Sequence, residues 1–189
     1  MYRAIVFDFF DVIHADPFHR WLGKNGYERR EFEESSRRLD GGLISDDEFY
    51  KELGRLSGRS TASVKAVFSQ TDQIDKQLVK LIGMLRGRYK IGLLSNSSGS
   101  YLRPILEEHG LNGLFDVTAI SAEVGFIKPQ PEIFQHILKE MGVEARETIF
   151  IDDNPRNVEA AAAVGIKSIV YTGEPALRIE LARLGIKVA

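Results

Sequence analysis

The sequence contains no cysteine, which excludes disulfide bonds, zinc–thiolate sites and thiol catalysis. Positive charge is not in excess either, because 25 lysines and arginines face 27 aspartates and glutamates, for a net charge of −2. No basic field therefore indicates binding to nucleic acid or to an anionic membrane surface. No apolar run approaches the roughly 20 residues of a membrane span, and the opening MYRAIVFDFF becomes acidic too early for a signal peptide. These absences predict a cytoplasmic enzyme or binding protein.

Short apolar runs alternate with helical segments over much of the chain. One run covers residues 3–7, and four others follow at 91–94, 117–120, 148–151 and 168–171. Continuous apolar strands that alternate with helices are typical of a parallel sheet covered on both faces. The sequence therefore predicts an α/β fold with a Rossmann-like parallel sheet.

Residues that begin and end helices lie between these runs. Pro131 suits a first helical turn and Gly142 a helix end, and Asn154 with Pro155 opens a further helix that Gly165 closes. Helix boundaries at these positions leave room for the predicted strands.

A long helical insertion separates the first two predicted strands. Ser45 and Glu48 form a capping-box pattern, and an apolar stripe at helical spacing runs over residues 74–85. The charged stretch ERREFEESSRRLD between the first strand and Ser45 is expected to be a solvated helix with a narrow apolar seam. Because a plain crossover helix needs far fewer residues, we predict a small helical cap over residues 15–87. The α/β core is then formed by residues 1–14 and 88–189.

Polar side chains stand at the carboxyl ends of the predicted strands, where open parallel sheets bind ligands. The residues at those ends are Asp8, Ser95, Asn96, Lys128, Asp152 and Asp153. Three carboxylates at one edge repel one another unless a proton or a cation neutralises them. Mg²⁺ suits such oxygen ligands and also binds phosphate oxygens, so the set indicates phosphoryl transfer. A carboxylate can be a covalent nucleophile, and a hydroxyl with a nearby amide such as Asn96 can hold phosphate oxygens.

Four blocks of the sequence resemble the haloacid dehalogenase (HAD) superfamily of phosphatases and related hydrolases. They are VFDFFDVI (6–13), LLSNSS (93–98), SAEVGFIKPQPEIF (121–134) and IFIDDNPRNVEAAAAVGI (149–166). The insertion resembles the small helical cap of the subgroup that contains haloacid dehalogenases, sugar-phosphate phosphatases and epoxide hydrolase phosphatase domains. The resemblance implies that Asp8 is the nucleophile and that Ser95 binds the phosphoryl group. It also implies that Lys128 neutralises the negative charge of the nucleophile and of the phosphate.

The resemblance also implies a Mg²⁺ site. Asp8 and Asp153 would be direct ligands, Asp152 a ligand or a partner through water, and Phe10 a ligand through its backbone carbonyl. Phosphatases of the family usually carry a second aspartate at the position of Phe10, as general acid and base. This sequence departs from the family there, and it also has Asp11 where the family often has glycine.

Two residues close to Phe10 could replace the missing acid. Side chains alternate along an extended strand, so Asp11 starts on the side opposite to Asp8, and a turn-forming role is the main expectation for it. His14 has a pKa that suits acid–base catalysis near neutrality, although an ordinary loop position is the simpler interpretation. His14, His19, Arg20, Trp21 and Lys24 lie near the entry to the cap and could line the cleft, and His14 and Arg20 are the candidates for substrate binding.

Three functions remain open from the sequence. The first is a Mg²⁺-dependent phosphatase of a small phosphorylated metabolite, slowed by the lack of the second acid and active as a monomer or a homodimer. The second is a metal-independent 2-haloacid dehalogenase, which Phe10 favours and the Asp152–Asp153 pair disfavours. The third is a binding or regulatory protein that retains the fold and the anion site. A phosphonatase is a residual possibility, without an identifiable Schiff-base lysine in the cap.

Overall fold

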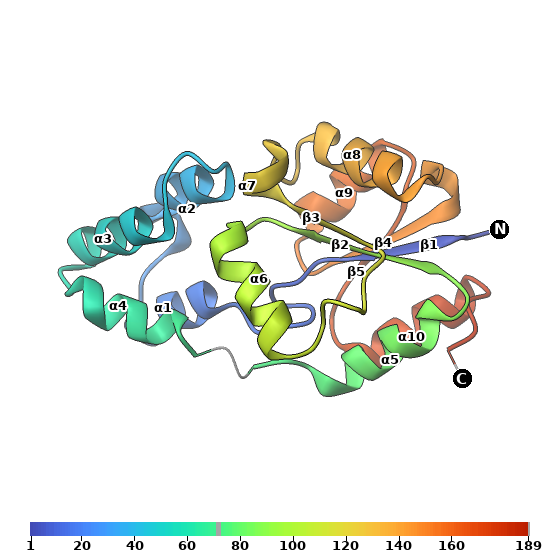
Figure 1. The fold of residues 1–189 in the computed structure, drawn as a ribbon, viewed down its shortest axis with the longest axis horizontal. Coiled ribbons are helices and arrows are strands. Elements are labelled where there is room, and N and C mark those ends of the chain that lie inside the picture. Colours follow the sequence, from blue (N-terminus) through green and yellow to red (C-terminus); the bar gives the residue numbers. More distant parts are fainter. Residues whose placement is uncertain (71–72, 189) are drawn as a thin grey trace.

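A five-stranded parallel sheet forms the centre of the protein in a computed structural model that describes residues 1–70 and 73–188 (Figure 1). The strands are β1 (Ala4–Phe7), β2 (Lys90–Ser95), β3 (Val117–Ile120), β4 (Thr148–Asp152) and β5 (Lys167–Val170). Their spatial order is β3-β2-β1-β4-β5, and every neighbouring pair is parallel. The predicted α/β fold is confirmed, and each predicted apolar run is a strand whose ends differ by at most one residue.

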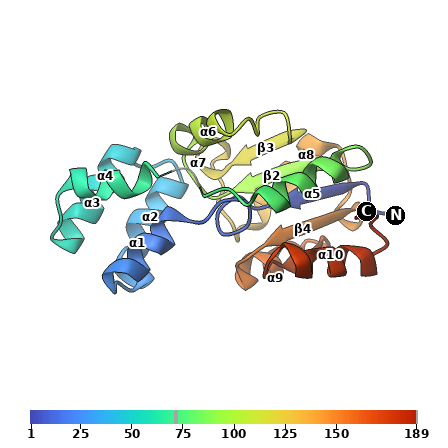
Figure 2. The same cartoon turned by 90° about the horizontal axis from the view of Figure 1, so that it is seen from below.

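Helices cover both faces of the sheet (Figures 1 and 2). One face packs against α5 (Lys76–Arg86), α6 (Gly99–Glu108) and α10 (Glu174–Arg183), and the other against α8 (Pro131–Met141) and α9 (Pro155–Ala163). Strand β1 supplies both layers, because Ile5 and Phe7 join the first apolar cluster whereas Ala4 and Val6 join the second. A strand buried on both sides needs the continuous apolar run that its sequence has.

Two short elements connect the sheet to these helices. They are α7 (Ser121–Val124) after β3 and the 3₁₀ turn η2 (Ala145–Glu147) before β4. The predicted helix boundaries are confirmed at both ends of α8, where Pro131 occupies the first turn and Gly142 is a left-handed C-cap. Asn154 caps α9 through its side chain, which accepts a hydrogen bond from the Arg156 backbone N–H.

The helical cap is a separate lobe beside the sheet (Figure 1). It comprises α1 (Pro17–Asn25), the 3₁₀ turn η1 (Arg29–Glu31), α2 (Glu33–Asp40), α3 (Asp46–Ser57) and α4 (Thr61–Phe68). Its apolar side chains form a cluster of their own around Trp21 and Phe32, which are 2% and 1% exposed. The capping box of Ser45 and Glu48 is present at the start of α3. The charged stretch is not one helix, because η1 ends before Phe32 and α2 begins after it.

Helix α5 packs against the sheet, although the predicted cap boundary at residue 87 would place this helix in the cap. The apolar stripe of this helix, from Leu78 to Leu85, is fully buried against the sheet and belongs to the first cluster of the core. The helical signal alone could not distinguish a cap helix from a sheet-covering helix, because both have one apolar face. By its contacts, α5 belongs with the core, and the lobe formed by α1 to α4 precedes it.

The cap is docked onto the core at a few specific contacts. The Ser121 hydroxyl donates to the Asp40 backbone carbonyl over 2.6 Å, and the carboxylate of Asp46 accepts hydrogen bonds from Ser98 (2.6 Å) and Ser100 (2.5 Å). Gly42 lies so close to α7 that an added Cβ would stand 2.8 Å from the carbonyl oxygen of Ala122. These contacts hold the end of α2 and the start of α3 over the edge of the sheet.

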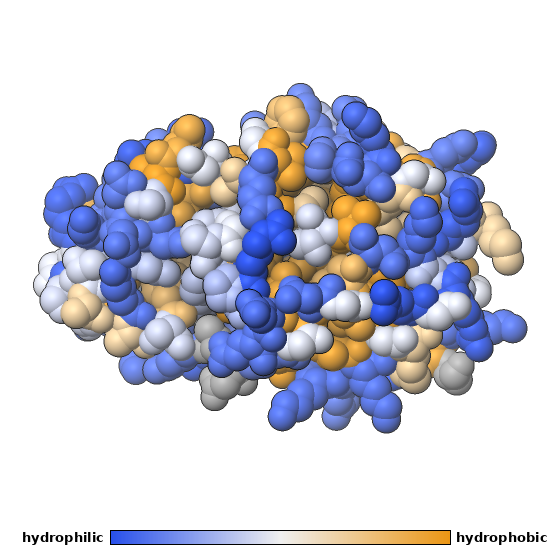
Figure 3. Space-filling model, in the orientation of Figure 1, coloured by the Kyte–Doolittle hydropathy of each residue, from blue (hydrophilic) through white to orange (hydrophobic). Residues whose placement is uncertain are grey.

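On the face shown in Figure 3, hydrophilic residues are spread over both the cap and the core instead of gathering on one of them. None of the described helices is both long and apolar enough to cross a membrane.

Candidate active site

Three buried charged residues meet where β1 and β4 end. The Lys128 ammonium lies 2.7 Å from Asp8 Oδ1 and 2.7 Å from Asp152 Oδ2, and it donates a hydrogen bond to Asp152. Asp8 is 7% exposed, Lys128 4% and Asp152 0%. The sheet fixes this geometry, because Asp8 follows β1 and donates its backbone N–H to the carbonyl of Ile151 in β4. The sequence-based prediction that these side chains share one edge of the sheet agrees with this arrangement.

The two adjacent aspartates after β4 have different surroundings. Both oxygens of Asp152 are occupied: they accept hydrogen bonds from Lys128, from the backbone N–H of Asn154 and from the side-chain amide of Asn157. Asp153 is half-buried and lines the cavity described below. Asp152 therefore orients Lys128, whereas Asp153 faces the space where a ligand would bind.

Negative charge exceeds positive charge in this cluster. Burial raises the pKa of the Asp8 carboxyl well above its ordinary value, Lys128 opposes this shift, and Asp152 and Asp153 add to it. Burial also raises the pKa of Asp153, with Asp152 contributing. Burial disfavours the charged form of Lys128, but the carboxylates of Asp8 and Asp152 outweigh it and raise the Lys128 pKa.

A divalent cation fits this donor set. One oxygen each from Asp8, Asp152 and Asp153 lies within 4.8 Å of the others, and the ammonium of Lys128 contacts Asp8 and Asp152. Hard cations such as Mg²⁺ prefer carboxylate oxygens, and a bound cation would favour the ionised forms that burial opposes.

Ser95, the last residue of β2, has a hydroxyl without a partner among the described residues. Ser95 Oγ is fully buried, and no described residue forms a hydrogen bond with it. A buried polar atom without a partner is unfavourable unless a ligand or water satisfies it. Asn96 is different, because its side chain donates to the Lys128 carbonyl (2.9 Å) and accepts from the Lys128 backbone N–H (2.8 Å). Asn96 lines the cavity, yet its amide already holds the backbone that carries Lys128.

A cavity of about 720 Å³ lies between this edge of the sheet and the cap. Asp8, Lys128 and Asp153 line its floor, and side chains from the cap line the rest. Part of its wall is aromatic, formed by Phe10, Phe18, Phe49, Phe68 and Tyr101. The ring of Phe10 is stacked on Tyr101 of α6, with centroids 6.0 Å apart. The side chain that replaces the usual acid is therefore part of an apolar wall.

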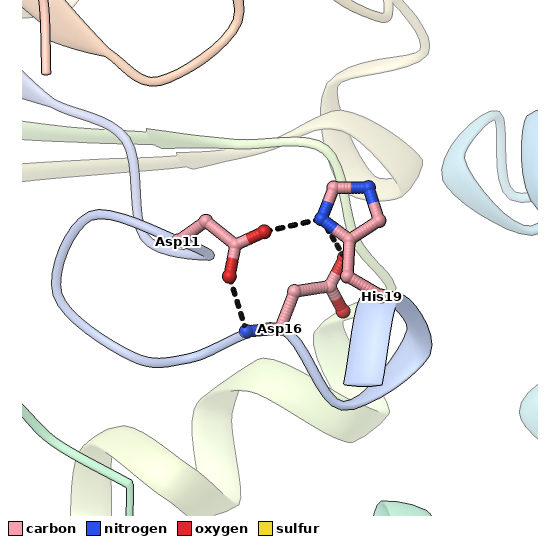
Figure 4. A group of neighbouring side chains, drawn as sticks. All are labelled: Asp11, Asp16 and His19. Carbon is pink, nitrogen blue, oxygen red and sulfur yellow. Dashed lines mark hydrogen bonds and ion pairs between the residues drawn. The ribbon is translucent and has the colours of Figure 1, made fainter. Parts of the chain in front are cut away.

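Asp11 forms a turn and joins a polar network that the sequence did not reveal (Figure 4). Its φ of 56° lies in the left-handed region, where aspartate is tolerated and glycine is favoured. Its carboxylate accepts hydrogen bonds from the Asp16 backbone N–H (2.8 Å) and from His19 Nδ1. The other ring nitrogen of His19 contacts Arg29, and His19, Asp16 and Arg29 all line the cavity.

Two predicted substrate-binding residues lie elsewhere. His14 is 1% exposed, stacks on Phe9 with centroids 5.6 Å apart and lines a different hollow, beside Tyr171. Arg20 is exposed and does not line the cavity. Helix α1 begins at Pro17, so successive residues turn by about 100° and His19, not Arg20, faces inward. Of the residues near the first block that could line the cleft, His19 therefore lines the cavity, whereas Arg20 does not.

Comparisons with known proteins give one consistent result. A family model described as haloacid dehalogenase-like hydrolase matches residues 2–165. The chain is 32% identical over 155 residues to a sesquiterpene phosphatase of Aspergillus oryzae, covering 80% of this chain and 79% of that protein. It is 32% identical over 139 residues to a D-ribitol-5-phosphate phosphatase of Bacteroides thetaiotaomicron, covering 69% of this chain and 68% of that protein.

A solved structure has the same fold. It is a HAD family enzyme of Bacteroides thetaiotaomicron in complex with magnesium and inorganic phosphate, with a TM-score of 0.71 and 24% identity. The match covers 92% of this chain and 96% of that one.

Proposed function

The chain belongs to the haloacid dehalogenase-like hydrolase family, and from that membership we propose that it is a Mg²⁺-dependent phosphatase of a small phosphorylated metabolite. The observation that carries the proposal is the buried contact of Lys128 with Asp8 and Asp152, beside Asp153, at the floor of the cavity. The cluster has more carboxyl groups than ammonium groups, so it can accept a metal ion. The ammonium and the metal ion together would offset the negative charge of a phosphate ester.

Asp8, Asp153 and the backbone carbonyl of Phe10 would hold the metal ion. Asp152 would act through Lys128, because both of its carboxylate oxygens already have hydrogen-bond donors. When bound, Mg²⁺ offsets negative charge on the phosphoryl group and on the nucleophile.

The residues of the chain then have distinct roles in the reaction. Asp8 attacks phosphorus and forms an aspartyl-phosphate, which water later hydrolyses. Lys128 stabilises the charge of the transferring group, and the unpartnered hydroxyl of Ser95 donates to one of its oxygens. The cap closes the cavity and limits the size of the substrate.

The relatives support phosphate-ester chemistry and leave the substrate open. One is named for a sesquiterpene phosphate substrate and the other for D-ribitol 5-phosphate. The cavity of this chain combines arginines, among them Arg29 and Arg37, with an aromatic wall. We therefore expect a phosphate monoester whose organic part has an apolar face.

A turnover panel with and without metal tests the proposal. We expect hydrolysis of p-nitrophenyl phosphate and of phosphorylated metabolites in Mg²⁺ and its loss in excess EDTA. Asp8→Asn should abolish this activity, with Asp47→Asn, an exposed cap residue, as the matched control. Equal activity in EDTA would contradict the metal requirement. Release of chloride from 2-chloropropionate without metal would identify a dehalogenase instead, and binding of phosphate without any turnover would favour a binding protein.

A further inference from the structure

Phosphate transfer from poor leaving groups needs a proton donor that Phe10 does not provide. General acid–base catalysis typically contributes 10²–10⁴-fold, so its complete absence would leave the enzyme slow. The cavity holds several titratable cap and loop residues besides Asp8 and Asp153. They are Asp11, Asp16, His19, Glu33 and Asp40.

Most of these groups are engaged or exposed. Asp11 and His19 form an ion pair with each other, and the Asp16 carboxylate accepts the Phe18 backbone N–H as the cap of α1. Glu33 is exposed at the start of α2. Asp40 is less exposed than Glu33 and, unlike the carboxylates of Asp11 and Asp16, accepts no hydrogen bond from a described residue at its carboxyl group. It lines the cavity at the end of α2.

The surroundings of Asp40 suit a group that both gives and takes a proton. Burial raises its pKa from the ordinary value of 3.8 to about 7. The charged groups that face it are Arg29 and Lys128, which lower the pKa, and Asp16, which raises it. A catalytic acid or base is most effective when its pKa is near the working pH.

The backbone of Asp40 is fixed to the loop that directly follows Ser95 at the end of β2. The Asp40 carbonyl accepts a 2.6 Å hydrogen bond from Ser121 Oγ, and that hydroxyl accepts a 3.0 Å hydrogen bond from the Ser97 backbone N–H. One hydroxyl thus connects the end of α2 to the residue two places after Ser95. The connection fixes the backbone of Asp40, a cavity-lining residue, against this part of the core.

We propose that Asp40, supplied by the cap, is the catalytic acid and base that replaces the missing carboxylate at Phe10. This inference rests on the proposed phosphatase function. In the first step the Asp8–phosphorus bond forms, the ester P–O bond breaks and the Asp40 carboxyl gives its proton to the departing oxygen. In the second step the Asp40 carboxylate takes a proton from water as the water oxygen bonds to phosphorus and the Asp8–phosphorus bond breaks. Each cycle returns the proton to Asp40.

Asp40→Asn tests this role with three ring-shaped esters of similar size and progressively poorer leaving groups: p-nitrophenyl, phenyl and cyclohexyl phosphate. The ratio kcat/KM reports the first step alone. We expect it to change less than about threefold for p-nitrophenyl phosphate and to fall roughly 10²-fold or more for cyclohexyl phosphate. Because the second step also loses its base, p-nitrophenolate should appear in a pre-steady-state burst that the wild type lacks. Asp47→Asn, the same substitution at an exposed cap position, should show neither effect.

The outcomes separate the alternatives. An equal loss of kcat/KM for all three esters, without a burst, would mean a structural role and would overturn the proposal, as would no loss at all. Absence of turnover of every ester by the wild type in Mg²⁺ would overturn the phosphatase function itself. If Asp40→Asn does not fold, as judged by circular dichroism, Asp40→Ser serves for the same measurement. Adding Phe10→Asp to the Asp40→Asn or Asp40→Ser variant should recover part of the cyclohexyl phosphate activity, because it restores a carboxyl group to the site. Failure to recover any activity would count against the assignment of Asp40.

Discussion

The ammonium of Lys128 lies 2.7 Å from the carboxylate of Asp8, and both groups are almost completely enclosed. Removing one partner of a buried ion pair leaves the other charge without compensation. Lys128→Met should therefore abolish phosphatase activity and lower the free energy of unfolding by about 3–5 kcal/mol near neutral pH. Urea unfolding and turnover measure the two effects, and Lys139→Met on the exposed side of α8 is the control. Stability equal to that of the wild type would mean that the contact does not hold the site together.

Ser95→Ala should change stability and activity in opposite directions. The hydroxyl is buried and has no partner among the described residues, so its removal eliminates a desolvated polar group. We expect the melting temperature to stay constant or rise, with a gain of up to about 1 kcal/mol. Activity should fall roughly 10–10²-fold, because a donor to the phosphoryl group is lost. A large loss of stability would show that Ser95 has a structural partner after all.

Phe10→Asp should leave turnover of esters with poor leaving groups little changed, because Asp40 already supplies the proton that a carboxylate at this position would give. The substitution also removes the ring that stacks on Tyr101, so Phe10→Leu serves as the control for the packing change. Parallel assays on phenyl and cyclohexyl phosphate measure the effect. A fall for both variants would indicate that the aromatic wall matters more than the added acid.

The pKa of Asp40 predicts a dependence of stability on pH. In the unfolded chain the carboxyl loses its proton near pH 3.8, whereas in the folded protein it keeps the proton up to about pH 7. The folded state therefore binds more protons between these values, and its stability decreases as pH rises through this window. Asp40→Asn should remove the penalty and raise the free energy of unfolding at pH 8 by at most about 4 kcal/mol, with little change at pH 4. Water in the cavity will reduce this figure, and unfolding curves at both pH values test its sign.

Asp46→Ala should weaken the docking of the cap without altering the floor of the cavity. Its carboxylate accepts hydrogen bonds from Ser98 and Ser100, whereas the adjacent Asp47 is paired with Lys65 inside the cap. We expect KM to rise several-fold for Asp46→Ala and to remain unchanged for Asp47→Ala. Identical kinetics for the two variants would mean that these serine contacts do not control closure.

The core could be predicted because its signals are local. Each strand is an apolar run of four to six residues with polar side chains at its end, and parallel pairing brings those ends to one edge. Asp8, Lys128 and Asp152 therefore lie together, as the sequence indicates. The distinction between Asp152 and Asp153 was not predictable, since it depends on the side chain of Asn157 one turn into α9.

The cap side of the cavity could not be predicted in the same way. Its residues come from the start of α1, from η1, from α2, and from α3 and α4, and only tertiary packing decides which of their side chains face the core. His14 and Arg20 were candidates because they are close to Asp8 in sequence, yet His14 is buried against Phe9 and Arg20 lies on the exposed side of α1. Asp40 gave no signal at all, because an aspartate before two glycines has the composition of an ordinary turn.

The hydroxyl of Ser121 has a consequence for affinity. It accepts a hydrogen bond from the Ser97 N–H and donates one to the Asp40 carbonyl, so it bonds both to the loop that follows Ser95 and to the cap. If docking of the cap orders that loop and so tightens the binding of phosphate, one coupling free energy connects docking and binding, and it is the same in both directions. Phosphate should then favour the docked cap by the same factor by which docking tightens the binding of phosphate.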